Sequence, residues 1–289
     1  MDNLTTGKRE NLAPVAGDVE LIVGDVRDLE ATRRASQGVE LVFHEAAIVS
    51  VPYSVEHPEE TLAVNLTGTL NVLLAARDAG ARRLIFACSA AVYGEDLELP
   101  KKESMKPAPV SPYGVEKIGG EQYLHVFSRL FGLETVSLRY FNVFGPRQDP
   151  SSPYSGVISI FADRILGGRP ITIFGNGLQT RDFVYVDNVV DANLLAAARE
   201  GVSGRAYNIA CGARTTLLEL AEQMGEVSGR SVSIAHAPPR PGDVQDSFAD
   251  ISLAREELGY APLVPVKEGL GRLLASLAPP TPLLEGGFP

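Results

Sequence analysis

Short apolar runs alternate with longer amphipathic segments through the first half of the chain, and this alternation constrains the fold more than any other feature. Apolar runs at 19–23, 41–44, 84–87 and 135–140 predict strands, and the segments 29–37, 59–79 and 112–131 predict helices. Strands that alternate with helices form parallel sheets through βαβ units, whose crossovers are right-handed. The sequence therefore predicts an α/β fold built on a doubly wound parallel sheet.

The pattern changes after Gly145. Residues 146–153 are rich in proline and serine, which is typical of a loop. Beyond them we expect a short strand at 171–174 and helices at 155–166, 187–198, 216–228, 252–258 and 266–277. We expect residues 1–145 to form one region, to which 183–205 returns, and residues 146–289 to form mainly a smaller lobe.

The charge and the cysteine content argue against several classes of function. The net charge of −10 disfavours nonspecific binding to nucleic acid and to anionic lipid. The two cysteines, Cys88 and Cys211, have no zinc spacing and form no disulfide framework. No apolar run reaches the length of a membrane span, and the first residues lack a signal-peptide core. We expect a cytoplasmic protein with no metal and with no nucleic-acid or membrane partner.

Tyr113 and Lys117 lie four residues apart, so on a helix they share one face. A nearby ammonium lowers the pKa of a tyrosine from its usual value of about 10, which makes the phenolate a base for a hydroxyl group. Ser89 follows a predicted strand, at the edge where open α/β sheets bind ligands. Considered separately, Tyr113 and Lys117 are also typical of a pair on a helix surface, and Ser89 is also typical of a residue that caps the end of a strand. Together they favour a catalytic site of Ser89, Tyr113 and Lys117.

Several further stretches occur in the order found in one enzyme family: 2–7, 24–28, 44–47, 65–69, 139–146, 181–187 and 240–243. With the motif at 113–117, they make nearly the whole chain resemble the nucleotide-sugar epimerases and dehydratases of the extended short-chain dehydrogenase family. The resemblance implies a Rossmann-type sheet that binds NAD in residues 1–145, and a nucleotide-sugar site mainly in 146–289. A soluble enzyme of this kind is expected to be a homodimer, held together by the helices at 59–79 and 112–131.

The resemblance also assigns roles to residues. Tyr113 is the base, Lys117 lowers its pKa and holds the nicotinamide ribose, and Ser89 orients the substrate hydroxyl. Further cofactor contacts are implied for Asp2, Asn3, Asp25, Val26, Ala46, Ala47, Asn65 and Phe141. Considered without the family, Asp25 is typical of a turn, and Asn65 of a helix residue that is satisfied locally.

One element of the expected fold does not occur at the start of the chain. The family opens with a strand, a glycine-rich turn and a helix, and the turn lets the backbone approach the cofactor pyrophosphate. No G-x-x-G-x-x-G occurs near Met1, and Asp2 matches the acidic residue that ends the second strand. We expect that about 30 residues, one strand–helix unit, precede Met1 in the natural chain. The alternative is a chain that is complete as it stands, with the flank of its sheet exposed.

The residues after Ser89 bear on the reaction. The 4,6-dehydratases of the family have an Asp-Glu pair there, because eliminating water needs a further acid and base. This chain has Ala90 and Ala91, which transfer no proton, and it also lacks the glutamate of the related decarboxylases. Epimerisation at C4 of a UDP-sugar fits, since it needs hydride transfer and one base. A ketoreductase would need the same three residues but would have to exchange its cofactor.

The substrate side is implied by the same resemblance. Arg181 and Arg240 would bind the diphosphate, as arginine forks match phosphate oxygens. Further contacts are implied for Asn142 (diphosphate or sugar), Asp243 (uridine ribose), and Thr172 and Phe174 (uracil). Considered without the family, Arg181 is typical of a surface salt bridge with Asp182.

Ser247 matches a position where related 4-epimerases differ in bulk. A small residue there leaves room for an N-acetyl group, so we expect UDP-GlcNAc and UDP-GalNAc to be accepted as well as UDP-Glc and UDP-Gal. The alternatives left open are a surface serine with no role, a UDP-glucose-only or UDP-glucuronate 4-epimerase, and an inactive truncated fragment that binds sugar nucleotides.

Overall fold

The computed structural model describes residues 1–148, 156–239 and 245–277, and its main sheet has four parallel strands. They are β1 (Leu41–His44), β2 (Arg83–Ser89), β3 (Glu134–Tyr140) and β8 (Arg205–Ile209), in that order across the sheet. Nearly all of β2 is buried, as expected for a central parallel strand that is covered on both faces. The predicted α/β fold with a parallel sheet is confirmed.

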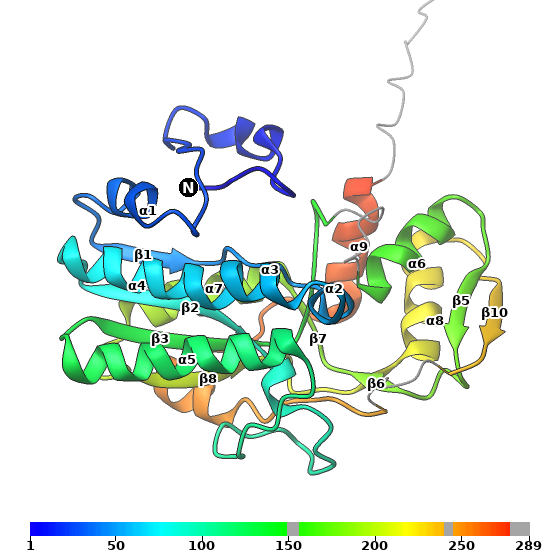
Figure 1. Cartoon of the computed structure of the whole chain (residues 1–289). Coiled ribbons are helices and arrows are strands. Elements are labelled where there is room, and N and C mark those ends of the chain that lie inside the picture. The colour runs from blue at the N-terminus through cyan, green and yellow to red at the C-terminus, as the bar shows by residue number, and fades with distance from the viewer. Residues whose placement is uncertain (149–155, 240–244, 278–289) are drawn as a thin grey trace, which may run out of the picture.

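Helices cover both faces of this sheet (Figure 1). α4 (Gly68–Asp78) and α5 (Pro112–Leu130) pack on one face, and α7 (Val186–Ala198) packs on the other. Around them lie η1 (Arg9–Val15), α1 (Leu29–Ala35), α2 (Val51–Glu56), α3 (Pro58–Leu62), the π-helical η2 (Ala63–Thr67) and the 3₁₀-helical η3 (Ala90–Tyr93).

Two neighbouring residues of β3 show which helix covers which face of the sheet, because their side chains point to opposite sides. Arg139 bonds Glu121 of α5, whereas the hydroxyl of Tyr140 accepts a hydrogen bond from Asn193 of α7. The steps from β2 to β3 and from β3 to β8 move across the sheet in the same direction, so these two crossovers have opposite hands. The expectation that every crossover is right-handed is wrong here, because the chain leaves the sheet for the second lobe between β3 and α7.

The strand predicted at 19–23 is also wrong. The chain there is extended, but its pairing consists of one parallel bridge, between Asp2 and Val23. Val19 and Val23 are 46% and 54% exposed, and Phe43 on β1 is 42% exposed. Within the described residues no ladder links the segment at Val23 to β1, and a strand without a neighbour gains little from its apolar side chains.

The second lobe has its own core. β5 (Ile171–Phe174) pairs in parallel with β10 (Ile234–Ala237), and α6 (Val157–Leu166), α8 (Leu217–Ser228) and α9 (Val266–Leu277) pack beside them. Short pairs join β4 (Asn142–Phe144) to β7 (Phe183–Tyr185), and β6 (Thr180–Arg181) to β9 (Thr215–Thr216). The π-helical η4 (Ala254–Leu258) returns to the core of the main sheet.

Strand β7 joins the two cores because its side chains alternate. Val184 belongs to the apolar cluster under the main sheet, and its neighbours Phe183 and Tyr185 belong to the cluster of the second lobe. The division of the chain at residue 145 stays a prediction. In the described part of the chain, no helix has both the length and the apolar character that a membrane crossing requires.

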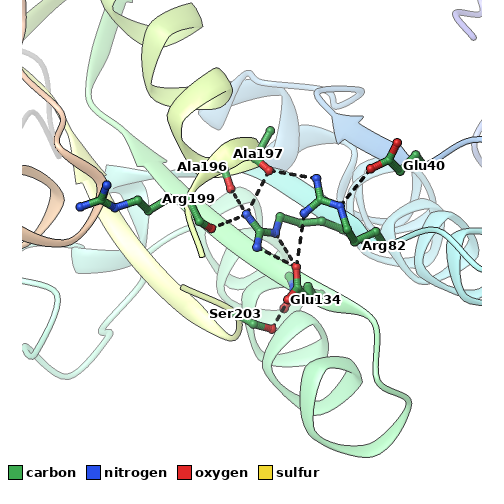
Figure 2. A network of polar contacts seen from close by, with 9 residues as sticks. Glu40, Arg82, Glu134, Ala196, Ala197, Arg199 and Ser203 are labelled. Atoms are coloured by element: carbon green, nitrogen blue, oxygen red, sulfur yellow. Dashed lines mark hydrogen bonds and ion pairs between the residues drawn. The ribbon is translucent and has the colours of Figure 1, made fainter. Parts of the chain in front are cut away.

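A buried arginine at the first residue of β2, Arg83, joins the sheet to the end of α7, where Figure 2 labels Ala196, Ala197 and Arg199. Arg83 is 1% exposed, and its Nη1 donates to the carbonyl oxygens of Ala196, Ala197 and Arg199 at 2.8, 3.0 and 2.6 Å. Its Nε and Nη2 atoms lie 2.8 and 2.7 Å from Glu134. The last carbonyls of a helix lack partners within the helix, and here the guanidinium supplies them.

Candidate active site

Ser89 ends β2, and the turn that follows defines its position. Its Oγ accepts a hydrogen bond from the N–H of Ala91 at 3.2 Å and so caps η3. The same hydroxyl lies near the phenol of Tyr113 and lowers its pKa. Ser89 is therefore both a strand-end cap and a neighbour of the predicted base.

Tyr113 lies in the first turn of α5, where several contacts hold it. The helix begins at Pro112, and the Oγ of Ser111 caps it by accepting from the N–H of Gly114 at 3.2 Å. The N–H of Tyr113 donates to the Oγ of Ser54 at 3.2 Å, and Ser54 is completely buried in α2. This hydrogen bond joins the start of α5 to a segment more than 50 residues earlier.

Lys117 lies one turn further along α5 and is 2% exposed. Its Nζ donates to the carbonyl oxygen of Ala87 at 2.7 Å, which places the ammonium against β2. The same Nζ lies 4.9 Å from the centre of the Phe86 ring and 5.7 Å from that of Tyr113. The structure thus brings all three predicted catalytic residues together at the carboxyl end of β2.

Burial dominates the ionisation of this pair in the ligand-free protein. It raises the pKa of Tyr113 to about 12, and the hydroxyl of Ser89 opposes the rise. Burial also lowers the pKa of Lys117, against the attraction of nearby acidic groups. Loss of hydration is thus the largest influence on the pKa of Tyr113 in the protein alone, and the lowering expected from Lys117 stays a prediction.

Residues predicted for the adenosine side also meet. The side-chain N–H of Asn3 donates to Asp25 at 2.9 Å, and the backbone of Asp2 pairs with the segment before Asp25. Arg27 donates to the Asp25 carboxylate from Nε and Nη2 at 2.9 and 2.8 Å. These hydrogen bonds hold the pKa of Asp25 far below its usual value, so the carboxylate is charged.

The other predicted cofactor residues differ in accessibility. Ala46 and Ala47 begin two residues after the end of β1, and Ala46 is exposed. Val26 packs against the main core, and its carbonyl accepts a hydrogen bond from a helix asparagine. Phe141 is 6% exposed, with its ring centre 6.3 Å from that of Tyr93, so it is a core residue in this structure.

Asn65 is 1% exposed, and its amide is used within the protein. Its Oδ1 accepts from the N–H of Ile48 at 2.8 Å, and its Nδ2 donates to the Ile48 carbonyl at 3.0 Å and to Glu116 at 2.7 Å. The direct cofactor contact implied for Asn65 has no support here, because both amide N–H groups already have acceptors. The residue instead holds the loop that follows Ala46 and Ala47.

On the substrate side, Arg181 and Ser247 lie on neighbouring segments. The Nη1 of Arg181 donates to the carbonyl of Thr180 at 2.8 Å and to that of Gln245 at 3.4 Å. The N–H of Ser247 donates to the same Thr180 carbonyl at 3.2 Å. The predicted residues Arg240 and Asp243 lie outside the described residues.

The remaining substrate candidates lie on strands. Thr172 is exposed in the middle of β5 and Phe174 is half-buried at its end. The Nδ2 of Asn142 donates to the carbonyl of Asp182 at 3.2 Å. The Asp182 side chain is completely buried and accepts backbone N–H groups from 211–213 and 249, which excludes the surface salt bridge considered for Arg181.

Sequence reasoning missed two residues that shape this site, Ser54 and Glu116. Glu116 lies inside the Tyr-x-x-x-Lys segment and is 2% exposed. A charged residue at i+3 from the base points to the same helix face, and that spacing is a signal that could have identified it. Ser54 has no such signal, because only the folded chain brings it to Tyr113.

Comparisons with known proteins agree with this geometry. Residues 1–210 match the model of the NAD dependent epimerase/dehydratase family. A UDP-glucose 4-epimerase of Mycolicibacterium smegmatis is 37% identical over 276 residues, which cover 94% of this chain and 88% of that protein.

Two solved structures are also similar. The UDP-N-acetylglucosamine 4-epimerase of Methanobrevibacter ruminantium M1, in complex with UDP-N-acetylmuramic acid, has a TM-score of 0.91 and 37% identity, over 96% of this chain and 88% of that one. The UDP-glucose 4-epimerase of Thermus thermophilus, in complex with NAD, has a TM-score of 0.86 and 39% identity, over 95% and 89%. The chain belongs to the NAD-dependent epimerase/dehydratase family.

Proposed function

We propose that the protein interconverts UDP-sugars by epimerisation at C4, through a 4-keto intermediate and with NAD as cofactor. The observation that supports this best is the cluster of Ser89, Tyr113 and Lys117. In the sequence, Ser89 is followed directly by Ala90 and Ala91, which begin η3. The cluster has one base, and the two alanines offer no further acid for an elimination. The relatives named as 4-epimerases support the same reaction.

The residues present fit NAD at two places. The ammonium of Lys117 has three N–H donors, and among the described residues it has one hydrogen-bond acceptor, the carbonyl of Ala87, which leaves donors for ribose hydroxyls. Asn3 and Asp25 form a polar pair on the adenosine side. The chain has no G-x-x-G-x-x-G turn near Met1, and we assign no contact to the pyrophosphate.

NAD, when bound beside Tyr113 and Lys117, would supply the hydride acceptor and donor that epimerisation at C4 of the sugar requires. Ser89 donates a hydrogen bond to the 4-oxygen and orients it. Tyr113 takes the proton from that oxygen and gives it back after the sugar has turned. Lys117 stabilises the phenolate by its charge, because both groups are buried where water does not screen them.

For the substrate, we propose that both N-acetylated and plain UDP-hexoses are accepted. Ser247 is a small, half-buried residue on a segment that contacts the segment of Arg181. A diphosphate held by Arg181 would place the sugar beside this position. The relatives include proteins named for UDP-glucose and for UDP-N-acetylglucosamine, which supports the wider range.

The test is a turnover assay on the purified chain. UDP-GlcNAc or UDP-Glc is incubated with the protein and NAD, and the C4 epimer is quantified by chromatography. Formation of UDP-GalNAc and UDP-Gal supports the proposal. Failure of the NAD-loaded protein to form either product, with UDP-glucuronate turned over instead, would assign it to a uronate 4-epimerase.

We also propose a homodimer held through α5 and the helices beside it. Val115, Tyr123, Val126 and Leu130 lie on one face of α5 and are 39–71% exposed. Sedimentation at micromolar concentration should give the mass of two chains. A single-chain mass would contradict the proposal.

A further inference from the structure

A buried carboxylate lies between the two catalytic residues of α5. Glu116 is 2% exposed and points towards α3 and η2. Its Oε1 accepts from the hydroxyl of Thr61 at 2.7 Å, and its Oε2 accepts from the Nδ2 of Asn65 at 2.7 Å. A buried carboxylate is costly unless donors surround it, so these two contacts hold it in place.

The contact with Asn65 continues to the chain segment after β1. Asn65 forms two hydrogen bonds with the backbone of Ile48, one to its N–H and one to its carbonyl, at 2.8 and 3.0 Å. Ile48 is the residue after Ala46 and Ala47, the pair proposed to line the cofactor cleft. The side chain of Asn65 therefore links Glu116 of α5 directly to the backbone of this loop.

The backbone around Asn65 is adapted to this role. Asn65 lies in η2, a π-helical turn inserted between α3 and α4, and such turns are frequent at functional sites. The carbonyl of Asn65 accepts from the hydroxyl of Thr69 at 2.6 Å, and this hydroxyl also contacts the ring of His44, the last residue of β1, at 2.9 Å. The π turn thus ties Asn65 to the end of β1 by a second route.

We propose that Glu116 is a positioning residue for the cofactor side of the active site. Through Asn65 it holds the loop 46–48 at a constant distance from Tyr113 and Lys117, so that the cofactor and the base meet in one geometry. The inference rests on the proposed function for the identity of the cofactor. The coupling between Glu116 and Ile48 depends only on the hydrogen bonds described above.

The substitution that tests the coupling is Glu116→Gln. It keeps the shape of the side chain, but its amide group offers one oxygen and one NH₂, so one of the two donors that face it loses its acceptor. The matched control is Glu121→Gln, on the same helix. Glu121 is 7% exposed and accepts from Ser137 and Arg139, with no contact to Asn65.

The first readout is amide hydrogen exchange of Ile48 in the ligand-free protein. We expect Glu116→Gln to raise the exchange rate of Ile48 about tenfold or more, the factor expected for loss of a hydrogen bond to a charged group. Glu121→Gln should lower the overall stability and leave Ile48 protected relative to the rest of the core. If Ile48 exchanges no faster in Glu116→Gln than in Glu121→Gln, the coupling does not exist.

The second readout is a split between two affinities, measured by calorimetry. We expect Glu116→Gln to weaken NAD binding about tenfold and to leave UDP binding unchanged, because UDP is proposed to bind in the second lobe. An equal loss of both affinities, or faster exchange at Ile48 with an unchanged NAD affinity, would overturn the positioning role. A wild-type chain that binds no NAD but passes the exchange test would refute the proposed function and not the coupling.

A milder variant covers the case in which Glu116→Gln does not fold. Thr61→Val removes one hydrogen bond to Glu116 and keeps the carboxylate and its contact with Asn65. We expect the exchange of Ile48 to rise only a few-fold in this variant. No change at Ile48 in Thr61→Val would then contradict the proposal.

Discussion

Two adjacent arginines at the start of β2 provide a controlled test of the packing argument. Arg83 is 1% exposed and binds three carbonyls at the end of α7. The Arg82 side chain is 43% exposed, pairs with Glu40 at 3.1 Å and with Glu134 at 3.6 Å, and donates to the carbonyl of Ala197 at 3.3 Å (Figure 2). Replacing each by methionine removes the same charge and keeps most of the aliphatic volume. The two variants differ mainly in the groups that lose a hydrogen-bond donor, which are buried carbonyls for Arg83 and largely hydrated groups for Arg82.

The contacts set the expected magnitude. Removing one partner of a buried ion pair costs about 3–5 kcal/mol when the other charge stays buried. Glu134 is 40% exposed, so water can rehydrate it, and the loss then comes chiefly from the three carbonyls of 196–199. We therefore expect Arg83→Met to lower the free energy of unfolding by about 3 kcal/mol. Arg82→Met should cost less than about 1 kcal/mol, as exposed ion pairs do.

The assay is urea unfolding followed by far-ultraviolet circular dichroism, with all variants at one pH and one salt concentration. The midpoint should fall clearly for Arg83→Met and little for Arg82→Met, with the slope unchanged in both. If both variants lose the same free energy within about 0.5 kcal/mol, burial is not what makes Arg83 important. The reasoning about the end of α7 would then be refuted.

Three further predictions concern the site and its edge. Tyr113→Phe removes the proposed base and keeps the ring, so it should lower kcat by about 10² to 10⁴-fold with little change in UDP affinity. A kcat within tenfold of wild type would contradict the role of Tyr113 as the base. Ser247→Tyr should lower turnover of UDP-GlcNAc and spare that of UDP-Glc in the epimer assay, and an equal loss of both would exclude Ser247 from substrate selection. The carboxylate of Asp25, whose pKa is far below its usual 3.8, stabilises the fold above about pH 4 and stops doing so as the pH falls. Asp25→Asn should therefore be less stable than wild type at pH 7, with the difference shrinking below pH 4 in urea titrations; an unchanged difference would show that the charge is not responsible.

Much of the site was accessible from the sequence because it depends on local spacing. Tyr113 and Lys117 share a face of one helix, and Ser89 ends one strand, so their placement needed only the helix repeat and the rule for parallel sheets. The helices at 266–277 and 112–131 were predicted within a residue or two, because long amphipathic segments have a strong local pattern.

The remaining features depend on contacts between distant segments. The burial that raises the pKa of Tyr113, and its contact with Ser54, arise only when α2 packs on α5. The same holds for the link from Glu116 through Asn65 to Ile48, which joins three segments.

The sequence by itself determined most of the helices and strands and placed Tyr113 and Lys117 on one helix face, because backbone periodicity acts over a few residues. Only the tertiary structure decided the face on which α7 packs, the absence of a paired strand at 19–23, and the burial that raises the pKa of Tyr113. Each of these depends on which surfaces meet and exclude water, and no local pattern encodes that.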